Sequence, residues 1–162
     1  MSPDSPRERL KRLLGRPQPL VQAPMAGVQG HALALAVQAA GALGSLPAAM
    51  LSPPALLQEL QALQAGSGTA PGEPLPFNIN FFAHATPTPD AAVEARWREA
   101  LAPAYAAFGI DPAGIPAGPG RSPFSAALAD MLEPFRPAVV SFHFGLPEPA
   151  LLARVKAWGA TV

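Results

Sequence analysis

The sequence contains no cysteine in its 162 residues. Disulfide scaffolds, zinc sites built on thiolates and a cysteine nucleophile are therefore excluded, because each of them needs a thiol. A chain without cysteine suits a reducing compartment, so we expect a cytoplasmic protein. The chemistry of the protein must come from other side chains or from a bound cofactor.

The chain also lacks an excess of charge of either sign. Eleven basic residues balance eleven acidic ones, and charged residues make up 14% of the sequence. Such a chain has no basic surface that would gather nucleic acid or anionic lipid. Residues 17–58 carry no formal charge, but polar residues interrupt them before an apolar block of roughly 20 residues, the length of a membrane span, is reached. We expect no nucleic-acid partner, no membrane segment and no secretion signal.

Hydrophobic residues form 49% of the chain and alternate between short apolar runs and amphipathic stretches. Strands are predicted over 20–23, 43–48, 77–82 and 138–144, with the start of a fifth over 160–162. Helices are predicted over 31–40, 125–132 and 149–158, and from the pairs Ser52-Pro53 and Thr88-Pro89 onward. This alternation of strand and helix predicts a parallel sheet with helical crossovers.

The fold class that fits this order is α/β, of the (β/α)8 TIM-barrel type. A complete barrel has eight strands and roughly 250 residues, whereas this chain supplies the first four β/α units and the start of strand five. We predict an N-terminal helix over residues 1–16, between an N-cap at Ser5 and a stop at Gly15, and the N-terminal half of a barrel over residues 17–162.

Two helices are predicted to carry apolar stripes. In the N-terminal helix, Leu10, Leu13 and Leu14 are expected to face inward. In the long helix that opens at 88–89, Trp97 and Leu101 belong to the apolar stripe. We expect these apolar residues to be covered by a neighbouring surface.

Ligands of parallel β/α folds bind at the carboxyl ends of the strands. The predicted elements place four groups there: the turn at 23–27, Ser45, Asn80 and His143. The turn offers backbone amides and the Met25 thioether, which suit a flat neutral ring, although methionine among small residues is also typical of core packing. The Asn80 amide can hold a carbonyl or ring nitrogen, or it can cap local backbone.

His143 is the strongest single candidate. It ends a predicted buried strand and lies on the opposite face from Phe142 and Phe144. Imidazole in apolar surroundings can accept a proton near neutral pH, but a structural histidine would show the same pattern. His31, at a helix start, and His84, in a loop, fit capping or solvated roles. No paired spacing on one element suggests a metal site.

Four motifs, in this order, resemble the nitronate monooxygenase family, formerly called 2-nitropropane dioxygenases. They are Val21-Gln-Ala-Pro-Met-Ala-Gly-Val28, Gly41-Ala-Leu-Gly-Ser45, Asn78-Ile-Asn-Phe-Phe82 and Val140-Ser-Phe-His-Phe-Gly-Leu-Pro147. The resemblance implies a β/α barrel that binds FMN and oxidises alkyl nitronates with molecular oxygen.

The resemblance also implies roles for single residues. The turn that would lie against the flavin consists of Ala23, Pro24, Met25 and Ala26. Asn80 would bond to the flavin ring or its ribityl chain, and His143 matches the catalytic histidine of the family. His143 would orient the nitronate and, where a neutral nitroalkane is accepted, remove a proton from the carbon next to the nitro group.

The sequence departs from the family pattern after Val162. The family completes its FMN site with a Gly-rich segment after strand six and with phosphate-binding loops after strands seven and eight, and these elements do not occur in residues 1–162. We therefore expect a missing C-terminal half or a homodimer as partner. Two further interpretations stay open: a flavin-dependent enoyl reductase of the same barrel family, and a non-catalytic half-barrel that needs a partner.

Overall fold

The computed structural model describes residues 5–115 and 121–162, which belong to two compact units. One unit runs up to His84 and resumes at Ser122–Val162, and it contains the sheet. The other unit, Ala85–Arg121, contains one long helix. The strands and the residues predicted for the site all belong to the first unit.

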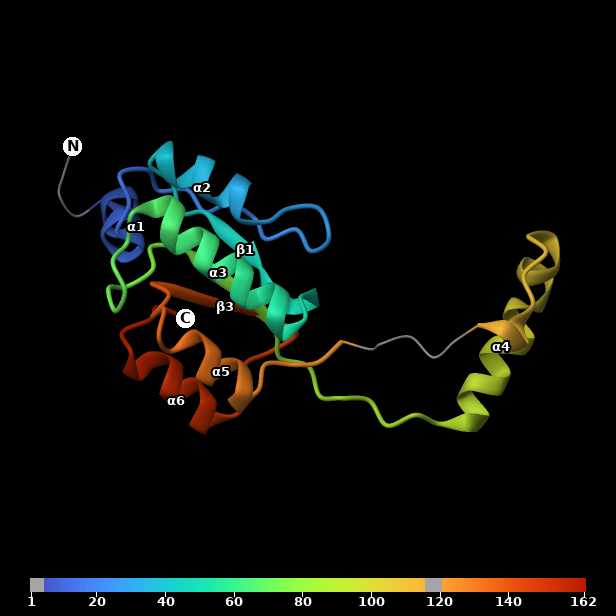
Figure 1. Cartoon of the computed structure of the whole chain (residues 1–162). Coiled ribbons are helices and arrows are strands. Elements are labelled where there is room, and N and C mark those ends of the chain that lie inside the picture. The colour runs from blue at the N-terminus through green and yellow to red at the C-terminus, as the bar shows by residue number, and fades with distance from the viewer. Residues whose placement is uncertain (1–4, 116–120) are drawn as a thin grey trace. The chain divides into compact units, whose positions relative to one another are not determined.

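The first unit is built on a three-stranded parallel sheet whose strand order follows the chain (Figure 1). Its strands are β1 (Ser45–Pro47), β2 (Asn78–Phe82) and β3 (Val139–His143). Single parallel bridges from Val21 to Leu43 and from Val139 to Thr161 add one more chain segment at each edge. The segments therefore lie side by side in chain order, as neighbouring strands of a β/α barrel do. The predicted α/β class with a parallel sheet is confirmed.

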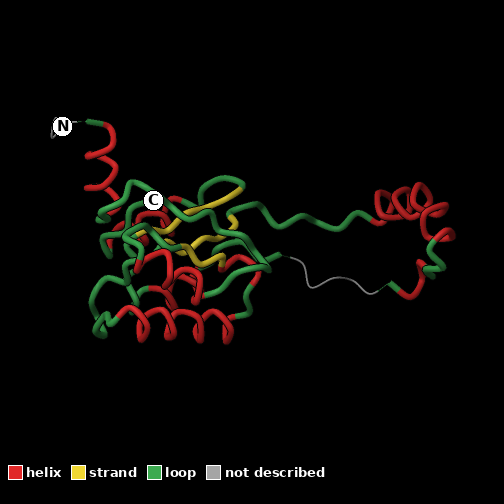
Figure 2. Tube along the Cα trace, turned by 90° about the horizontal axis from the view of Figure 1, so that it is seen from above, coloured by secondary structure: helices red, strands yellow, loops and turns green. Residues whose placement is uncertain are grey.

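The two faces of the sheet differ because successive residues of a strand point to opposite sides. Leu46, Ile79 and Val140 are partners across the three strands and are fully buried in one core. The helices of this unit are α1 (Pro6–Leu14), α2 (His31–Ala39), α3 (Pro53–Ser67), α5 (Ala126–Leu132) and α6 (Pro149–Ala157). In Figure 2 the helices lie mostly to one side of the strands.

The core between this face and the helices is aliphatic and aromatic. Its fully buried members include Leu56, Leu60, Leu63, Phe77, Leu132 and Val155. Burying a side chain of this size stabilises a fold by about 1.5–3 kcal/mol. The apolar face of the sheet therefore supplies most of the driving force, and the opposite face is free to carry polar residues.

The strand predicted over 20–23 is wrong in its extent, because only Val21 pairs, with Leu43. Two backbone hydrogen bonds of 2.9 Å flank this bridge. The next bond of a parallel ladder would run from residue 24 to the Ser45 carbonyl, but Pro24 has no N–H to donate. The pairing therefore stops, and the chain turns away from the sheet.

The other strands are also shorter than predicted, β2 and β3 by one and two residues. Only Thr161 of the segment over 160–162 pairs with the sheet. The strand predicted over 43–48 is regular only in β1, and Ala48–Met50 form a 3-10 helix. The regular strand ends at Pro47, where the chain enters this 3-10 helix.

Helix α1 begins and ends as predicted, with Ser5 as its N-cap and with Gly15 in a left-handed conformation at a φ of 62°. Leu14 is buried, but Leu10 and Leu13 are 38% and 58% exposed. The prediction that all three leucines face inward is therefore wrong for two of them, since only one edge of α1 is covered.

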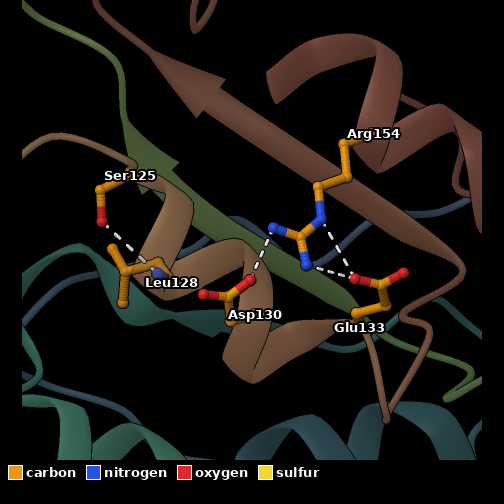
Figure 3. A network of polar contacts seen from close by, with 5 residues as sticks. All are labelled: Ser125, Leu128, Asp130, Glu133 and Arg154. Atoms are coloured by element: carbon orange, nitrogen blue, oxygen red, sulfur yellow. Dashed lines mark hydrogen bonds and ion pairs between the residues drawn. The ribbon is translucent and has the colours of Figure 1, made fainter. Parts of the chain in front are cut away.

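An ion network links α5 to α6 on the surface (Figure 3). Nη1 of Arg154 lies 2.7 Å from Oδ1 of Asp130, and its Nε and Nη2 both bond to Oε2 of Glu133. These two carboxylates raise the pKa of Arg154 above its ordinary value. Ser125 caps the start of α5 by accepting a bond from the Leu128 N–H at 3.4 Å. The ion pairs join α5, which precedes β3, to α6, which follows β3.

The second unit contains α4 (Ala91–Ala107), which starts later than predicted at 88–89 because Asp90 provides the N-cap. Its apolar stripe is not covered within the unit: Trp97 is 61% and Leu101 38% exposed. No helix in the described part of the chain is long and apolar enough to cross a membrane.

Gly44 provides a test of the packing of α2 against the sheet. A Cβ atom at this position would lie 2.2 Å from the backbone oxygen of Ala34, which cannot rotate away. Gly44→Ala should therefore lower the free energy of unfolding by about 3 kcal/mol, the upper end of overpacking penalties, as measured by urea denaturation. In Gly66→Ala the three atoms nearest to the new Cβ all belong to the Leu35 side chain, the first at 2.5 Å, and better helix propensity offsets part of the strain. Equal losses in the two variants would contradict this packing.

Candidate active site

The face of the sheet opposite to the Leu46 row carries polar side chains without formal charge. On the strands these are Ser45, Asn78, Asn80, Ser141 and His143. Ser45 is the partner of Asn78 in the register, and Asn80 is the partner of Ser141. Ser45, Asn78 and Asn80 are at most 3% exposed. Buried polar groups need hydrogen-bond partners, and these residues supply them to one another.

His143 and Asn80, which the sequence places at the same edge of the sheet, are in direct contact. Nδ1 of His143 lies 3.1 Å from Oδ1 of Asn80. The Asn80 Nδ2 donates to the Ser141 carbonyl oxygen at 3.1 Å and contacts the Ser141 Oγ at 2.9 Å. His143 is exposed, whereas Asn80 is buried. The imidazole is thus held at one nitrogen and is accessible at the carboxyl end of β3.

Ser45 is the centre of a second polar group. Its N–H donates to Oε1 of Gln22 at 3.1 Å, and its carbonyl oxygen accepts from Nε2 of Gln29 at 3.3 Å. The two glutamine side chains thus make the hydrogen bonds to Ser45 that a longer first strand would have made through its backbone. The Ser45 Oγ accepts from Nδ2 of Asn78 at 3.0 Å. The sequence analysis did not identify either glutamine as a site residue. Their side chains reach Ser45 only because the pairing of the first segment ends after Val21.

Three buried atoms around Ser45 have unused hydrogen-bonding capacity. Nε2 of Gln22, Oε1 of Gln29 and Oδ1 of Asn78 are buried and without a partner. One donor and two acceptors are therefore left over within the same group. Unsatisfied buried atoms are rare in folded proteins, so this group is suited to a ligand that offers complementary polar atoms.

The turn after Val21 borders this group. Pro24 is half-buried, and the other residues predicted to bind cofactor here are exposed, namely Ala23, Met25 and Ala26. Nε2 of Gln29 reaches both the Ala23 carbonyl oxygen and that of Ser45, at 3.3 Å each, and so ties the turn to β1. Met25 is 47% exposed, so the alternative that it fills the core is wrong. The turn presents an uncharged surface next to the polar face.

Aromatic rings adjoin His143. The ring of Phe82, the register partner of His143, lies 6.5 Å from the imidazole at 84°, and it lies 5.1 Å from the ring of Phe144. Phe144 has a φ of 67° and is 73% exposed. A bulky residue in this conformation is strained, and such strain concentrates at functional sites. The period-2 alternation of β2 could have identified Phe82, but the strain at Phe144 has no signal in the sequence.

The other two histidines have separate surroundings. His31 begins α2, and its N–H and Nδ1 lie 2.6 Å and 3.1 Å from Oε2 of Glu59. This carboxylate caps α2 at the positive end of its dipole. The His84 ring lies 6.1 Å from the Phe82 ring in an edge contact. Within the described residues, no three histidine, aspartate or glutamate side chains form a metal-binding group.

Comparison with known sequences gives one consistent result. The family model for nitronate monooxygenase matches residues 7–162. The chain is 39% identical over 166 residues to a nitronate monooxygenase of Paraburkholderia phytofirmans, and 38% identical over 165 residues to one of Pseudomonas aeruginosa. These alignments cover 98% and 96% of this chain but 42% and 43% of the relatives. The chain therefore spans less than half the length of the curated relatives it matches.

Solved structures with a similar fold include nitroalkane oxidase from Streptomyces ansochromogenes. That similarity has a TM-score of 0.70 at 35% identity and covers 93% of this chain and 40% of the other. A FabK variant from Thermotoga maritima gives a TM-score of 0.60 at 20% identity, with 95% of this chain and 37% of the other covered. The second similarity concerns the fold alone.

The two serines of the polar face provide a matched test. Ser45→Ala removes the acceptor for the Asn78 amide and leaves that buried group unbonded, whereas Ser141→Ala leaves Asn80 bonded to the Ser141 carbonyl. We expect Ser45→Ala to lower the free energy of unfolding by about 1–3 kcal/mol and Ser141→Ala to lower it by less, as measured by urea denaturation. A larger loss in Ser141→Ala would contradict the network.

Proposed function

The chain belongs to the nitronate monooxygenase family, an oxidoreductase family, and from this premise we propose that it forms the flavin-facing part of an FMN-dependent enzyme. The reaction that we propose is the oxidation of alkyl nitronates with molecular oxygen. Both curated relatives carry the name nitronate monooxygenase, and this favours the reaction over that of an enoyl reductase and over a non-catalytic role.

We also propose that residues 17–162 are the N-terminal half of a (β/α)8 barrel, preceded by an N-terminal segment, residues 1–16, that contains α1. Two observations support this: the paired segments of the sheet follow chain order, and the chain covers 42% of the first relative. The remaining strands would come from a C-terminal half or from a second copy, and the protein would act in the cytoplasm.

The residues of the polar face fit the ring of a flavin. The ring is flat and neutral, and its pyrimidine edge offers carbonyl oxygens and one N–H. The unused donor of Gln22 could bond to one of these carbonyl oxygens, and the N–H could donate to one of the two unused acceptors, Oε1 of Gln29 or Oδ1 of Asn78. When bound, FMN would supply the electron transfer between nitronate and oxygen.

Besides these three side chains, five residues would hold the ring. We assign this role to Ala23, Pro24, Met25, Ala26 and Asn80. Both polar atoms of the Asn80 amide already bond within the protein, so its contribution is the second lone pair of Oδ1. A phosphate calls for cationic groups or clustered backbone amides, and the side chains of this face are uncharged. We therefore assign phosphate binding to residues outside this chain.

His143 would be the catalytic residue, and one observation carries this assignment. Its ring is held at Nδ1 by Asn80 and is accessible at the carboxyl end of β3. From there it would orient the nitronate. With a neutral nitroalkane, it would take the proton from the carbon next to the nitro group, and the C–H electron pair would become the C=N bond of the nitronate.

Replacing His143 tests this role, because a nitronate has already lost the proton that the imidazole would remove. We expect His143→Asn to lower kcat/KM for a nitroalkane by about 10²–10⁴-fold and to lower it less for the preformed nitronate. Oxygen consumption by the FMN-loaded protein measures both. His31→Gln, at the start of α2, is the control and should leave both values near those of the wild type. Equal losses on the two substrates, or no loss, would reject the assignment.

A further inference from the structure

We propose that Asn80 is a positioning residue that keeps neutral His143 in the tautomer with hydrogen on Nδ1 and leaves Nε2 as the proton acceptor. The use of Nε2 in catalysis rests on the proposed function. The tautomer does not, because it follows from hydrogen bonds within β2 and β3 and can be measured without substrate or cofactor.

The orientation of the Asn80 amide is the first step. Its two ends differ, since Nδ2 only donates and Oδ1 only accepts. The group 3.1 Å from one end is the Ser141 backbone carbonyl, which can only accept. The nitrogen must therefore face Ser141, because the reversed amide would bring two oxygens together. The Ser141 hydroxyl, at 2.9 Å from the same nitrogen, can accept as well.

The tautomer of His143 is the second step. Once Nδ2 faces Ser141, the Asn80 Oδ1 faces Nδ1 of the imidazole at 3.1 Å. An amide oxygen cannot donate, so Nδ1 must carry a hydrogen to form this bond. A neutral imidazole has only one N–H. Nε2 is therefore bare, and its lone pair is available to a ligand.

The surroundings of His143 stabilise this tautomer and this orientation of its ring. Asn80 is 3% exposed, so water does not compete freely for its oxygen. The parallel register places Asn80 directly opposite Ser141 and Phe82 opposite His143. The Phe82 ring contacts the imidazole at 84° and 6.5 Å between centroids. Rotating the imidazole by half a turn would put a carbon opposite Oδ1 and lose the bond, so both the rotation state and the tautomer are selected.

The chemical consequence concerns one nitrogen. A proton taken from the carbon next to a nitro group would arrive on Nε2, and the electron pair of that C–H bond would remain on the substrate as the C=N bond of the nitronate. The imidazolium then carries hydrogen on both nitrogens and still donates from Nδ1 to Asn80. The opposite tautomer would present an N–H to the substrate and could not accept the proton.

The experiment reads the tautomer by NMR. Ring nitrogens with and without hydrogen have well-separated ¹⁵N chemical shifts, so long-range ¹H–¹⁵N spectra of the ¹⁵N-histidine-labelled chain at alkaline pH report each neutral ring. The His143 signals are assigned by their loss in His143→Asn. We expect hydrogen on Nδ1 in the wild type, a shift of population to the Nε2–H form in Asn80→Leu, and retention of the Nδ1–H form in Ser141→Ala, which keeps the carbonyl that orients the Asn80 amide.

Asn78→Leu is the matched control, because Asn78 lies on the same strand and face, is 2% exposed and bonds to Ser45. It should leave the His143 tautomer unchanged. Hydrogen on Nε2 in the wild type would overturn the inference, and so would equal changes in the two leucine variants. If Asn80→Leu does not fold, hydrogen on Nε2 in Ser141→Ala would also overturn the inference. Hydrogen on Nδ1 combined with full nitroalkane activity in His143→Asn would refute the proposed function and leave the tautomer assignment intact.

Discussion

The parallel register of the three strands is the constraint on which the site depends. It sets Asn78 against Ser45 and Asn80 against Ser141, all on the face away from the apolar core. A slip of one residue would turn Ile79 toward the polar side and the asparagines into the core. Both the hydrophobic core and the buried hydrogen bonds therefore select the same register, and the core supplies the stability that tolerates unsatisfied polar atoms nearby.

Proline shapes the other border of the site. Pro24 ends the pairing of the first segment with Leu43, and the freed positions on Ser45 are taken by Gln22 and Gln29. The same interruption releases the turn that exposes Met25. The early end of strand pairing at Pro24 thus creates an accessible neutral surface beside buried polar groups.

Local patterns in the sequence were enough to predict most elements and two residues of the central contact. The alternation of residues 77–82 separates Asn80 from the apolar face, and the position of His143 at the end of its strand follows from its apolar run. The partnership of Asn80 with Ser141 needs the register between strands that are distant in the chain. The exposure of Leu10 and Trp97 could not be predicted for a related reason: periodicity defines an apolar stripe but does not say whether another surface covers it.

The most direct test is to compare the dissociation constants of FMN and riboflavin for this chain, measured by the quenching of flavin fluorescence. In the proposed site the ring-binding groups belong to this chain and the phosphate-binding groups do not. The two flavins should therefore bind with dissociation constants that agree within about twofold, a difference under 0.5 kcal/mol. Binding of FMN at least tenfold tighter than riboflavin would reveal a phosphate site in this chain. Absence of binding of either flavin would show that the polar face does not hold the ring by itself, and either result would contradict the account.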